Sequence, residues 1–216
     1  MIPKLKLQSA PVNQVITPTE AKDFLRVDGS SEDSRISLLI NAATGRLEEY
    51  TGLKFISQTW QVFYDAFPRS SKNSGDDWWD GVREGAISDL SSLKPILELP
   101  FGTISSFTHF KTYDDADTAY VFSAANYSVD TIGPVGRVAL RLGSVWPTTV
   151  LRAMNGIEIQ AVFGFGANAT DVPAAIKQAV LELVSIMFEH RGDELPEIPA
   201  QALLLLDPYR RYKIGC

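Results

Sequence analysis

The chain has 216 residues, of which 45% are apolar and 21% are charged, so it can bury a core and has the composition of an ordinary globular protein. Its net charge of −6 excludes a general nucleic-acid coat, because neutralising phosphates requires clustered lysine and arginine. The charge is compatible with a protein that surrounds DNA without gripping it, since like charges prevent sticking.

The N-terminal region predicts two helices. Residues 1–15 lack the apolar stretch of a signal peptide, and no window of the chain is apolar enough to span a membrane, so we expect a soluble protein that is not exported by a standard signal. Thr17 and Glu20 form a capping box for a helix that begins at Pro18. Ser30 and Asp33 predict the start of a second, amphipathic helix, which Gly52 ends.

The middle of the chain changes from helical to alternating periodicity. Short segments rich in β-branched or aromatic residues, bounded by Gly, Pro, Asp or Asn, predict antiparallel strands in a small sandwich or barrel. These segments are Thr59–Phe67, Ile96–Pro100, Ile104–Tyr113, Tyr120–Phe122, Tyr127–Asp130, Arg137–Leu142 and Ile157–Phe163. Residues 68–90, rich in Ser, Gly and Asp, are predicted to form a long surface loop.

Helical periodicity returns near residue 171. Thr170 or Asp171 is the expected cap, Pro173 fits the first turn, and Arg191 with Gly192 closes the helix. Helices at both ends with strands between them predict an α+β fold, in which a small antiparallel β module is inserted into a helical core. We expect residues 1–56 to form the first part of that core, 57–164 the β subdomain with the loop 68–90, and 165–216 the second part of the core with a C-terminal tail.

The segment Gly164–Ala169 fits the dinucleotide fingerprint GxGxx(G/A) and lies between a strand and a helix. The helix starts too late to meet a phosphate held by these glycines, and no second parallel strand follows. We therefore interpret the segment as a glycine-rich turn and keep a nucleotide-binding enzyme as an alternative hypothesis.

Other clusters predict no chemistry. Asp114–Asp117 and the acidic residues around Trp78 and Trp79 lack the ligand spacing of a calcium loop, and turn formation explains the first of them better. His109 and His190 have no recognisable catalytic partner, and Cys216, the only cysteine, excludes a disulfide framework and a thiolate metal site and fits a reducing cytoplasm. We expect no catalytic residue, cofactor or metal, and therefore no enzyme.

Two segments have the residue types of protein interfaces. Trp78 and Trp79 are adjacent indoles in a polar loop, so either one anchors the loop on the sheet or the loop packs on a neighbouring subunit. The tail 207–213 combines Tyr and Arg, which interfaces favour, although a solvated terminus is the alternative.

The N-terminal half carries a family pattern. Its pieces are Thr19-Glu20-Ala21-Lys22, Leu25-Arg26-Val27-Asp28, Glu32-Asp33, Glu49-Tyr50-Thr51-Gly52 and Gln58-Thr59-Trp60. In this order they resemble the head–tail connector (adaptor) proteins of tailed phages and prophages. Further matching pieces follow along nearly the whole chain to Leu206–Arg210, and the Trp-bearing loop departs from the pattern.

The resemblance implies a structural virion protein. Such connectors form a ring under the portal, of about a dozen copies, and join the DNA-filled capsid to the tail. The partners implied are the portal protein, neighbouring copies, a stopper or tail-completion protein, and genomic DNA that passes without sequence-specific binding; no membrane is involved. The implied location is the virion neck, with assembly in the bacterial host cytoplasm, and a tail-completion or stopper protein of the same neck is the nearest alternative.

The resemblance also implies that the C-terminal segment reaches toward the portal. The portal- or partner-binding candidates are Leu203, Leu206, Tyr209, Arg210, Arg211, Tyr212 and Lys213, with Trp78 and Trp79 as inter-subunit candidates.

Overall fold

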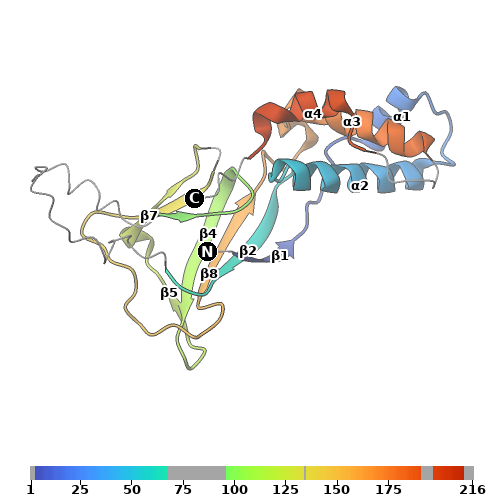
Figure 1. Cartoon of the computed structure of the whole chain (residues 1–216). Coiled ribbons are helices and arrows are strands. Elements are labelled where there is room, and N and C mark those ends of the chain that lie inside the picture. Colours follow the sequence, from blue (N-terminus) through green and yellow to red (C-terminus); the bar gives the residue numbers. More distant parts are fainter. Residues whose placement is uncertain (1–2, 68–95, 134, 191–196, 212–216) are drawn as a thin grey trace, which may run out of the picture.

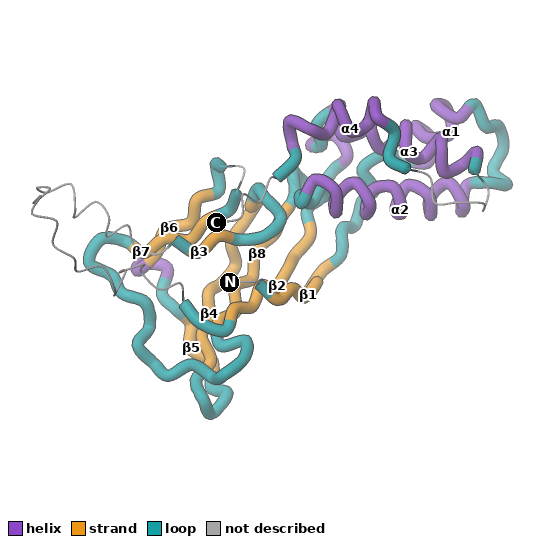
Figure 2. Tube along the Cα trace, in the orientation of Figure 1, coloured by secondary structure: helices purple, strands orange, loops and turns teal. Residues whose placement is uncertain are grey.

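The computed structural model describes residues 3–67, 96–133, 135–190 and 197–211. Helices pack together at one end of an elongated molecule, and two antiparallel sheets form the other end (Figures 1 and 2). The predicted α+β fold is confirmed. Because the helices come from both ends of the chain and most strands from its middle, segments distant in sequence meet in both halves.

The first helix, α1 (Pro18–Leu25), begins as predicted. The Thr17 hydroxyl accepts a hydrogen bond from the Glu20 amide at 3.1 Å, and the Glu20 carboxylate accepts one from the Thr17 amide at 2.7 Å. These bonds satisfy amides that a helix start otherwise leaves without partners. The Thr17 amide lowers the pKa of Glu20, and the ion pair with Lys177 acts in the same direction.

Two helix starts differ from the prediction. Helix α2 (Asp33–Thr51) has Glu32 as its N-cap without a side-chain bond, and the Asp33 carboxylate pairs with Lys22 of α1 at 2.7 Å. Helix α3 (Ala174–Glu189) is preceded by Pro173 as its N-cap, and Asp171 closes a separate 3-10 turn, where it accepts a bond from the Asn168 amide. The predicted C-terminal closure of α3 at residues 191–192 lies outside the described residues.

The helical end has its own hydrophobic cluster. Helices α2 and α3 and the short α4 (Ala200–Leu206) each bury one apolar face, which the periodicity of the sequence predicts. Its fully buried members include Ile36, Ile40, Leu47, Phe55, Ile176, Leu183 and Leu206.

The other end is a two-layered β structure. A five-stranded antiparallel sheet has the order β1-β2-β8-β4-β5, and a three-stranded sheet has the order β3-β7-β6. The strands are β1 (Lys4–Ser9), β2 (Gln58–Tyr64), β3 (Leu97–Glu98), β4 (Ile104–Tyr113), β5 (Ala119–Val121), β6 (Tyr127–Asp130), β7 (Arg137–Leu140) and β8 (Ile157–Phe163). Between the layers lies a second hydrophobic cluster that includes Val62, Phe110, Val138, Ile159 and Phe163.

Strand β1 was not expected from the sequence. It pairs with β2 from Lys4↔Phe63 to Ser9↔Thr59, although residues 1–56 were assigned to the helical core. Its Lys-Leu alternation is short, and all six of its residues are exposed. A strand with no buried residue leaves only a weak hydrophobic pattern, so the sequence does not predict its pairing with residues 50 to 59 positions further along the chain.

Candidate partner-binding site

Besides the connection 10–17 from β1 to α1, the chain crosses between the helical and β ends at residues 52–58 and 164–168, and these two crossings form what we call the junction. They run side by side: the Ser57 amide donates to the Gly166 carbonyl at 2.8 Å, and the Phe165 amide donates to the Phe55 carbonyl at 3.1 Å. The backbone bonds hold both crossings in one register. The junction therefore fixes how the two halves of the molecule meet.

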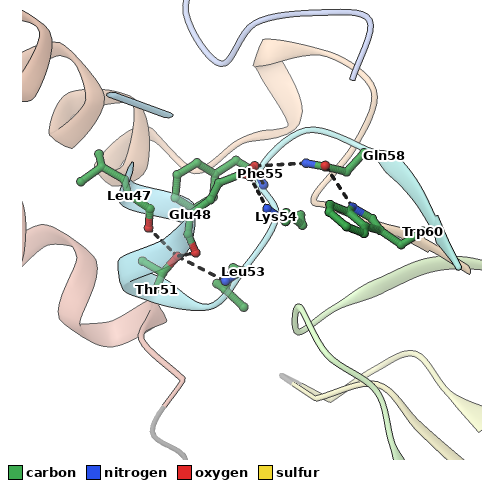
Figure 3. Close-up of polar contacts among 8 residues, drawn as sticks. All are labelled: Leu47, Glu48, Thr51, Leu53, Lys54, Phe55, Gln58 and Trp60. Atoms are coloured by element: carbon green, nitrogen blue, oxygen red, sulfur yellow. Dashed lines mark hydrogen bonds and ion pairs between the residues drawn. The ribbon is translucent and has the colours of Figure 1, made fainter. Parts of the chain in front are cut away.

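A buried carboxylate organises the first crossing (Figure 3). Glu48, in the last turn of α2, is only 8% exposed. Its oxygens accept hydrogen bonds from the Phe55 amide at 2.9 Å and from Gln58 Nε2 at 3.3 Å, and they pair with Lys54 Nζ at 2.8 Å. One side chain thus ties the helix end to the segment that enters β2.

The same cluster reaches the β end. Lys54 Nζ lies 5.3 Å from the ring centroid of Trp60 and 5.0 Å from that of Phe101. The Trp60 indole donates to Gln58 Oε1 at 3.0 Å. Cations held over aromatic faces are attracted to the ring quadrupole, so Lys54 links the carboxylate of α2 to the aromatic residues of the β layers.

The C-terminal segment packs against the junction. Leu206 is fully buried in the helical cluster, and Leu203 is partly exposed. The Tyr209 ring meets that of Phe165 edge-on at 6.3 Å between centroids. Of these three candidates, Leu206 belongs to the core, whereas Leu203 and Tyr209 keep some surface.

Two arginines extend this contact. The Arg210 guanidinium lies 4.6 Å from the centroid of the Tyr50 ring, and the Arg211 amide donates to the Thr51 carbonyl at 2.9 Å. Burial lowers the pKa of Arg211, and the nearby Glu98 carboxylate opposes that shift. Since Glu98 lies on β3, Arg211 places the described end of the chain between the helical and β halves.

Some candidates cannot be placed. Tyr212, Lys213, Trp78 and Trp79 lie outside the described residues. The sequence reasoning also missed Leu204, which is 75% exposed on α4 beside the predicted segment. Its signal was the run of four leucines from 203 to 206, which a seven-residue helix cannot bury completely.

The glycine turn serves the junction and is unsuited to a nucleotide. Gly164 has φ +137°, and a Cβ there would lie 2.6 Å from the backbone of Ile56 and Ser57. A Cβ on Gly166 would collide with the Asp171 side chain. The missing side chain of Gly164 leaves room for the backbone of the neighbouring crossing, and that of Gly166 leaves room for the Asp171 carboxylate. This carboxylate would repel a pyrophosphate. This packing supports the interpretation as a turn.

The outer face of the five-stranded sheet carries a polar network. Glu158 on β8 is 5% exposed and accepts from Tyr113 at 2.5 Å, Gln61 at 3.1 Å and His109 at 2.9 Å. Burial favours a higher pKa for Glu158, but the bonds from Tyr113 and His109 outweigh it and the pKa is lowered. The bond to Glu158 raises the pKa of Tyr113 to about 12.

The part of the chain that the structure describes offers no metal site of clustered side chains and no membrane-spanning helix. There, no group of three or more His, Cys, Asp or Glu side chains is placed to hold a metal ion. Asp114 instead binds the amides of Ala116 and Thr118 within its turn. In the same ranges no helix has the length and hydropathy needed to span a bilayer.

Comparison with known proteins connects this geometry to a family. Residues 16–75 match the profile of the phage gp6-like head-tail connector protein family. The resemblance to head–tail connectors is confirmed. The matched connector segment contains α1, α2, the first crossing of the junction and β2. No match was found among the curated proteins.

Solved structures share the fold along nearly the whole chain, each covering 98% of this chain and 97% of its own. The neck of an empty gene transfer agent (GTA) particle, computed with C6 symmetry, aligns at 20% identity with a TM-score of 0.76. The virion of the native GTA particle aligns at 20% identity with a TM-score of 0.75. The neck of the native particle, computed with C12 symmetry, aligns at 19% identity with a TM-score of 0.71. The connector segment and the β layers therefore belong to one shared fold.

The connector pattern already contained part of the junction. Gln58 and Trp60 stand in its Gln-Thr-Trp motif, and Glu48 directly precedes its Glu-Tyr-Thr-Gly motif. The sequence pattern identifies these residues only as scaffold and does not predict that Glu48, Lys54 and Gln58 form one cluster. The observable signal was a glutamate on the apolar stripe of α2, one residue after Leu47.

Proposed function

We propose that the protein is a structural head–tail connector subunit in the neck of a phage-like virion, where it forms a ring under the portal and joins the DNA-filled capsid to the tail. The observation that carries this proposal is the family match of the N-terminal segment combined with a fold shared over 98% of the chain with GTA neck and virion structures. A ring subunit acts through surfaces, so the proposal includes no catalytic site.

A ring of about a dozen copies is the proposed assembly, formed by repeated heterologous contacts. The GTA neck computed with C12 symmetry supports that copy number. The net charge of −6 fits a channel through which genomic DNA passes without sequence-specific contacts. The remaining partners are the portal and a stopper or tail-completion protein, met during assembly in the host cytoplasm.

The C-terminal segment is the proposed portal contact. Leu203, Tyr209 and Arg210 keep exposed surface, and Tyr209 also packs against the helical cluster. Tyr212 and Lys213 continue this segment, and the neighbouring Leu204 adds a 75% exposed side chain. Tyr and Arg are the residue types that interface centres favour, and Leu204 adds exposed apolar area beside them.

Electron microscopy of the purified chain mixed with its portal tests the function. We expect a ring of this chain on the tail-facing side of the portal. A chain that attaches only beyond another neck protein would identify it as a stopper or tail-completion protein, and a chain absent from all neck complexes would contradict the proposal. Because connectors can stay monomeric until they meet their template, a monomer in solution decides nothing alone.

Two truncations test the C-terminal contact. A chain ending at Leu206 loses the contacts of Tyr209, Arg210 and Arg211 and is expected to lose portal binding in a pull-down while keeping its helical circular dichroism. A chain ending at Arg211 keeps the described contacts and shows whether Tyr212 and Lys213 contribute. Unchanged binding of the shorter chain would refute the role of the segment.

A further inference from the structure

The backbone of Arg211 is held at the end of helix α2. Its amide donates a hydrogen bond to the Thr51 carbonyl at 2.9 Å. Thr51 is the last residue of α2, and the last four carbonyls of a helix have no partner within that helix. A Cβ built on Gly52, the left-handed residue that follows, would lie 3.6 Å from the Arg211 Cβ. The C-terminal segment therefore caps a helix from the other end of the sequence.

The Arg211 side chain extends from the helical end toward the β end. Arg211 is partly buried, and this burial lowers its pKa, whereas the negative charge of Glu98 on β3 opposes that shift. Tyr64 on β2 interacts with the same two charges, and its hydroxyl donates to the Glu98 carbonyl at 2.6 Å. A cation loses hydration on burial, so its position is favourable only near a compensating charge. Arg211 thus has its backbone at the helical end and its charge near the β end.

Arg210 faces a different side of the same short segment. Its backbone is extended, with φ −68° and ψ 127°, and in such a backbone successive side chains point to different sides. Arg210 is exposed, and its guanidinium lies 4.6 Å from the centroid of the Tyr50 ring. The two adjacent arginines, which look equivalent in the sequence, are therefore placed differently: Arg210 can meet a partner, and Arg211 holds the segment.

Such an anchor affects binding because a chain end is otherwise poorly ordered. Residues near a terminus are ordered only where hydrogen bonds or packing hold them. Immobilising side chains on binding costs free energy, and a segment already held in its bound conformation avoids part of that cost. The hydrogen bond from Arg211 to Thr51 follows directly after Tyr209 and Arg210, so it limits the conformations open to both.

We propose that Arg211 is a positioning residue, which pins the C-terminal segment to the end of α2 and holds Tyr209 and Arg210 in the conformation that binds the portal, without touching the portal itself. The inference rests on the proposed portal contact and separates two roles within it. Residue type makes all three side chains binding candidates, and the geometry assigns the direct contact to Tyr209 and Arg210.

A disulfide in place of the arginine tests this role. In a background with Cys216→Ser, the double variant Gly52→Cys, Arg211→Cys removes the guanidinium and offers a covalent anchor instead. The 3.6 Å between the two Cβ positions lies within the range found in disulfides. Binding to immobilised portal is measured for the oxidised and the reduced protein. We expect the reduced form to bind roughly tenfold more weakly than the background chain, and the oxidised form to bind within about twofold of it.

The single variants are the controls. Gly52→Cys with Arg211 retained accounts for the strain of a side chain at φ +70° and should bind like the background chain. Arg211→Cys with Gly52 retained cannot form the disulfide and should bind weakly under both conditions. Arg210→Ala, added to the oxidised double variant, should weaken binding again, because the disulfide replaces the anchor and leaves the direct contact missing.

Four outcomes would overturn the inference. Weak binding of the oxidised form with its disulfide intact would show that the Arg211 guanidinium contacts the portal directly. A reduced form that binds like the background chain would show that the anchor is not needed. A disulfide that does not form on oxidation would show that the segment is not held at α2. Failure of the background chain itself to bind portal would overturn the proposed portal contact and this inference with it.

A measurement on the free protein needs neither the portal nor a change at Gly52. A nitroxide spin label is attached through Arg210→Cys in the Cys216→Ser background. Its electron paramagnetic resonance spectrum should show a more mobile label when Arg211→Ala is added, because the segment has lost its anchor. Unchanged mobility would contradict the positioning role, even if Arg211→Ala lowers portal binding.

Discussion

At the scale of single residues, Glu48 occupies a position that local rules disfavour. A carboxylate in the last turn of a helix opposes the helix dipole, and a buried one loses its hydration. The Phe55 amide, Lys54 and Gln58 compensate for both costs within hydrogen-bonding distance. The position is therefore favourable only when the segment after the helix folds back, which makes Glu48 specific for this junction.

Replacing Glu48 by Gln should lower the free energy of unfolding by about 1–3 kcal/mol. Lys54 loses its charged partner, and the side-chain NH2 of the new Gln must face a donor, either the Lys54 ammonium or the Phe55 amide. Glu49 is exposed in the same turn, so Glu49→Gln is the matched control. This substitution should change the free energy of unfolding by less than about 0.5 kcal/mol. Urea unfolding followed by circular dichroism measures both. Equal effects of the two substitutions would show that the Glu48 cluster adds nothing.

At the scale of elements, the turn from β8 to α3 depends on backbone that only glycine adopts easily. Gly164 combines a positive φ with direct contact to the backbone of the other crossing, and neither can be relieved by rotating a side chain. The turn thus connects β8 to α3, and it also packs directly against residues 56–57 of the other crossing.

Gly164→Ala should therefore destabilise the protein by about 2 kcal/mol or more. Gly45 lies inside α2 with open space around it, so Gly45→Ala should stabilise the protein by about 0.5–1 kcal/mol. Chemical denaturation of both alanine variants gives the comparison. Stability changes of the same sign would contradict the strained turn.

Elements were predictable where burial imposed a strong period. The alternation in β2, β4 and β8 and the apolar stripes of α2 and α3 gave their positions within a few residues, because one face of each is buried. The start of α2 was misjudged because Asp33 pairs with Lys22, a contact between helices that local capping rules do not contain.

The candidate site was predictable only in part. Residue type alone makes Tyr209 and Arg210 candidates, and both retain surface. Leu206 looked similar in an apolar run but is fully buried, because the facing helices decide which leucine of a short helix is covered. The Glu48 cluster joins residues 48 to 60 across the end of a helix and the start of a strand, so it does not follow from local sequence.

At the scale of the whole molecule, the two hydrophobic clusters are mechanically linked. Phe55 and Ile56 belong to the helical cluster, whereas Gln58 and Phe163 pair within the sheet that covers the other. The crossings between them are short and hydrogen-bonded to each other. Unfolding of one hydrophobic cluster would therefore destabilise the junction, and with it the part of the other cluster that packs next to the junction.

We expect a single cooperative unfolding transition. Helical circular dichroism should report the helical end, and fluorescence of Trp60 and Trp146 should report the β end in a chain where Trp78 and Trp79 are replaced by Phe. The two urea midpoints should coincide, since the junction couples the clusters. Separate midpoints would show that the halves fold independently, and chains keeping only Trp60 or only Trp146 would locate the boundary.

The nesting of the chain has a consequence for its synthesis. Strand β8 lies at the centre of the five-stranded sheet, and α3 and α4 complete the helical cluster, yet all three come from residues 157–206. A nascent chain of the first 150 residues can close neither cluster, and both are completed by the same late segment. Premature termination would leave both apolar surfaces open to chaperones and proteases. The topology therefore predicts that only chains that include residues 157–206 fold and enter assembly.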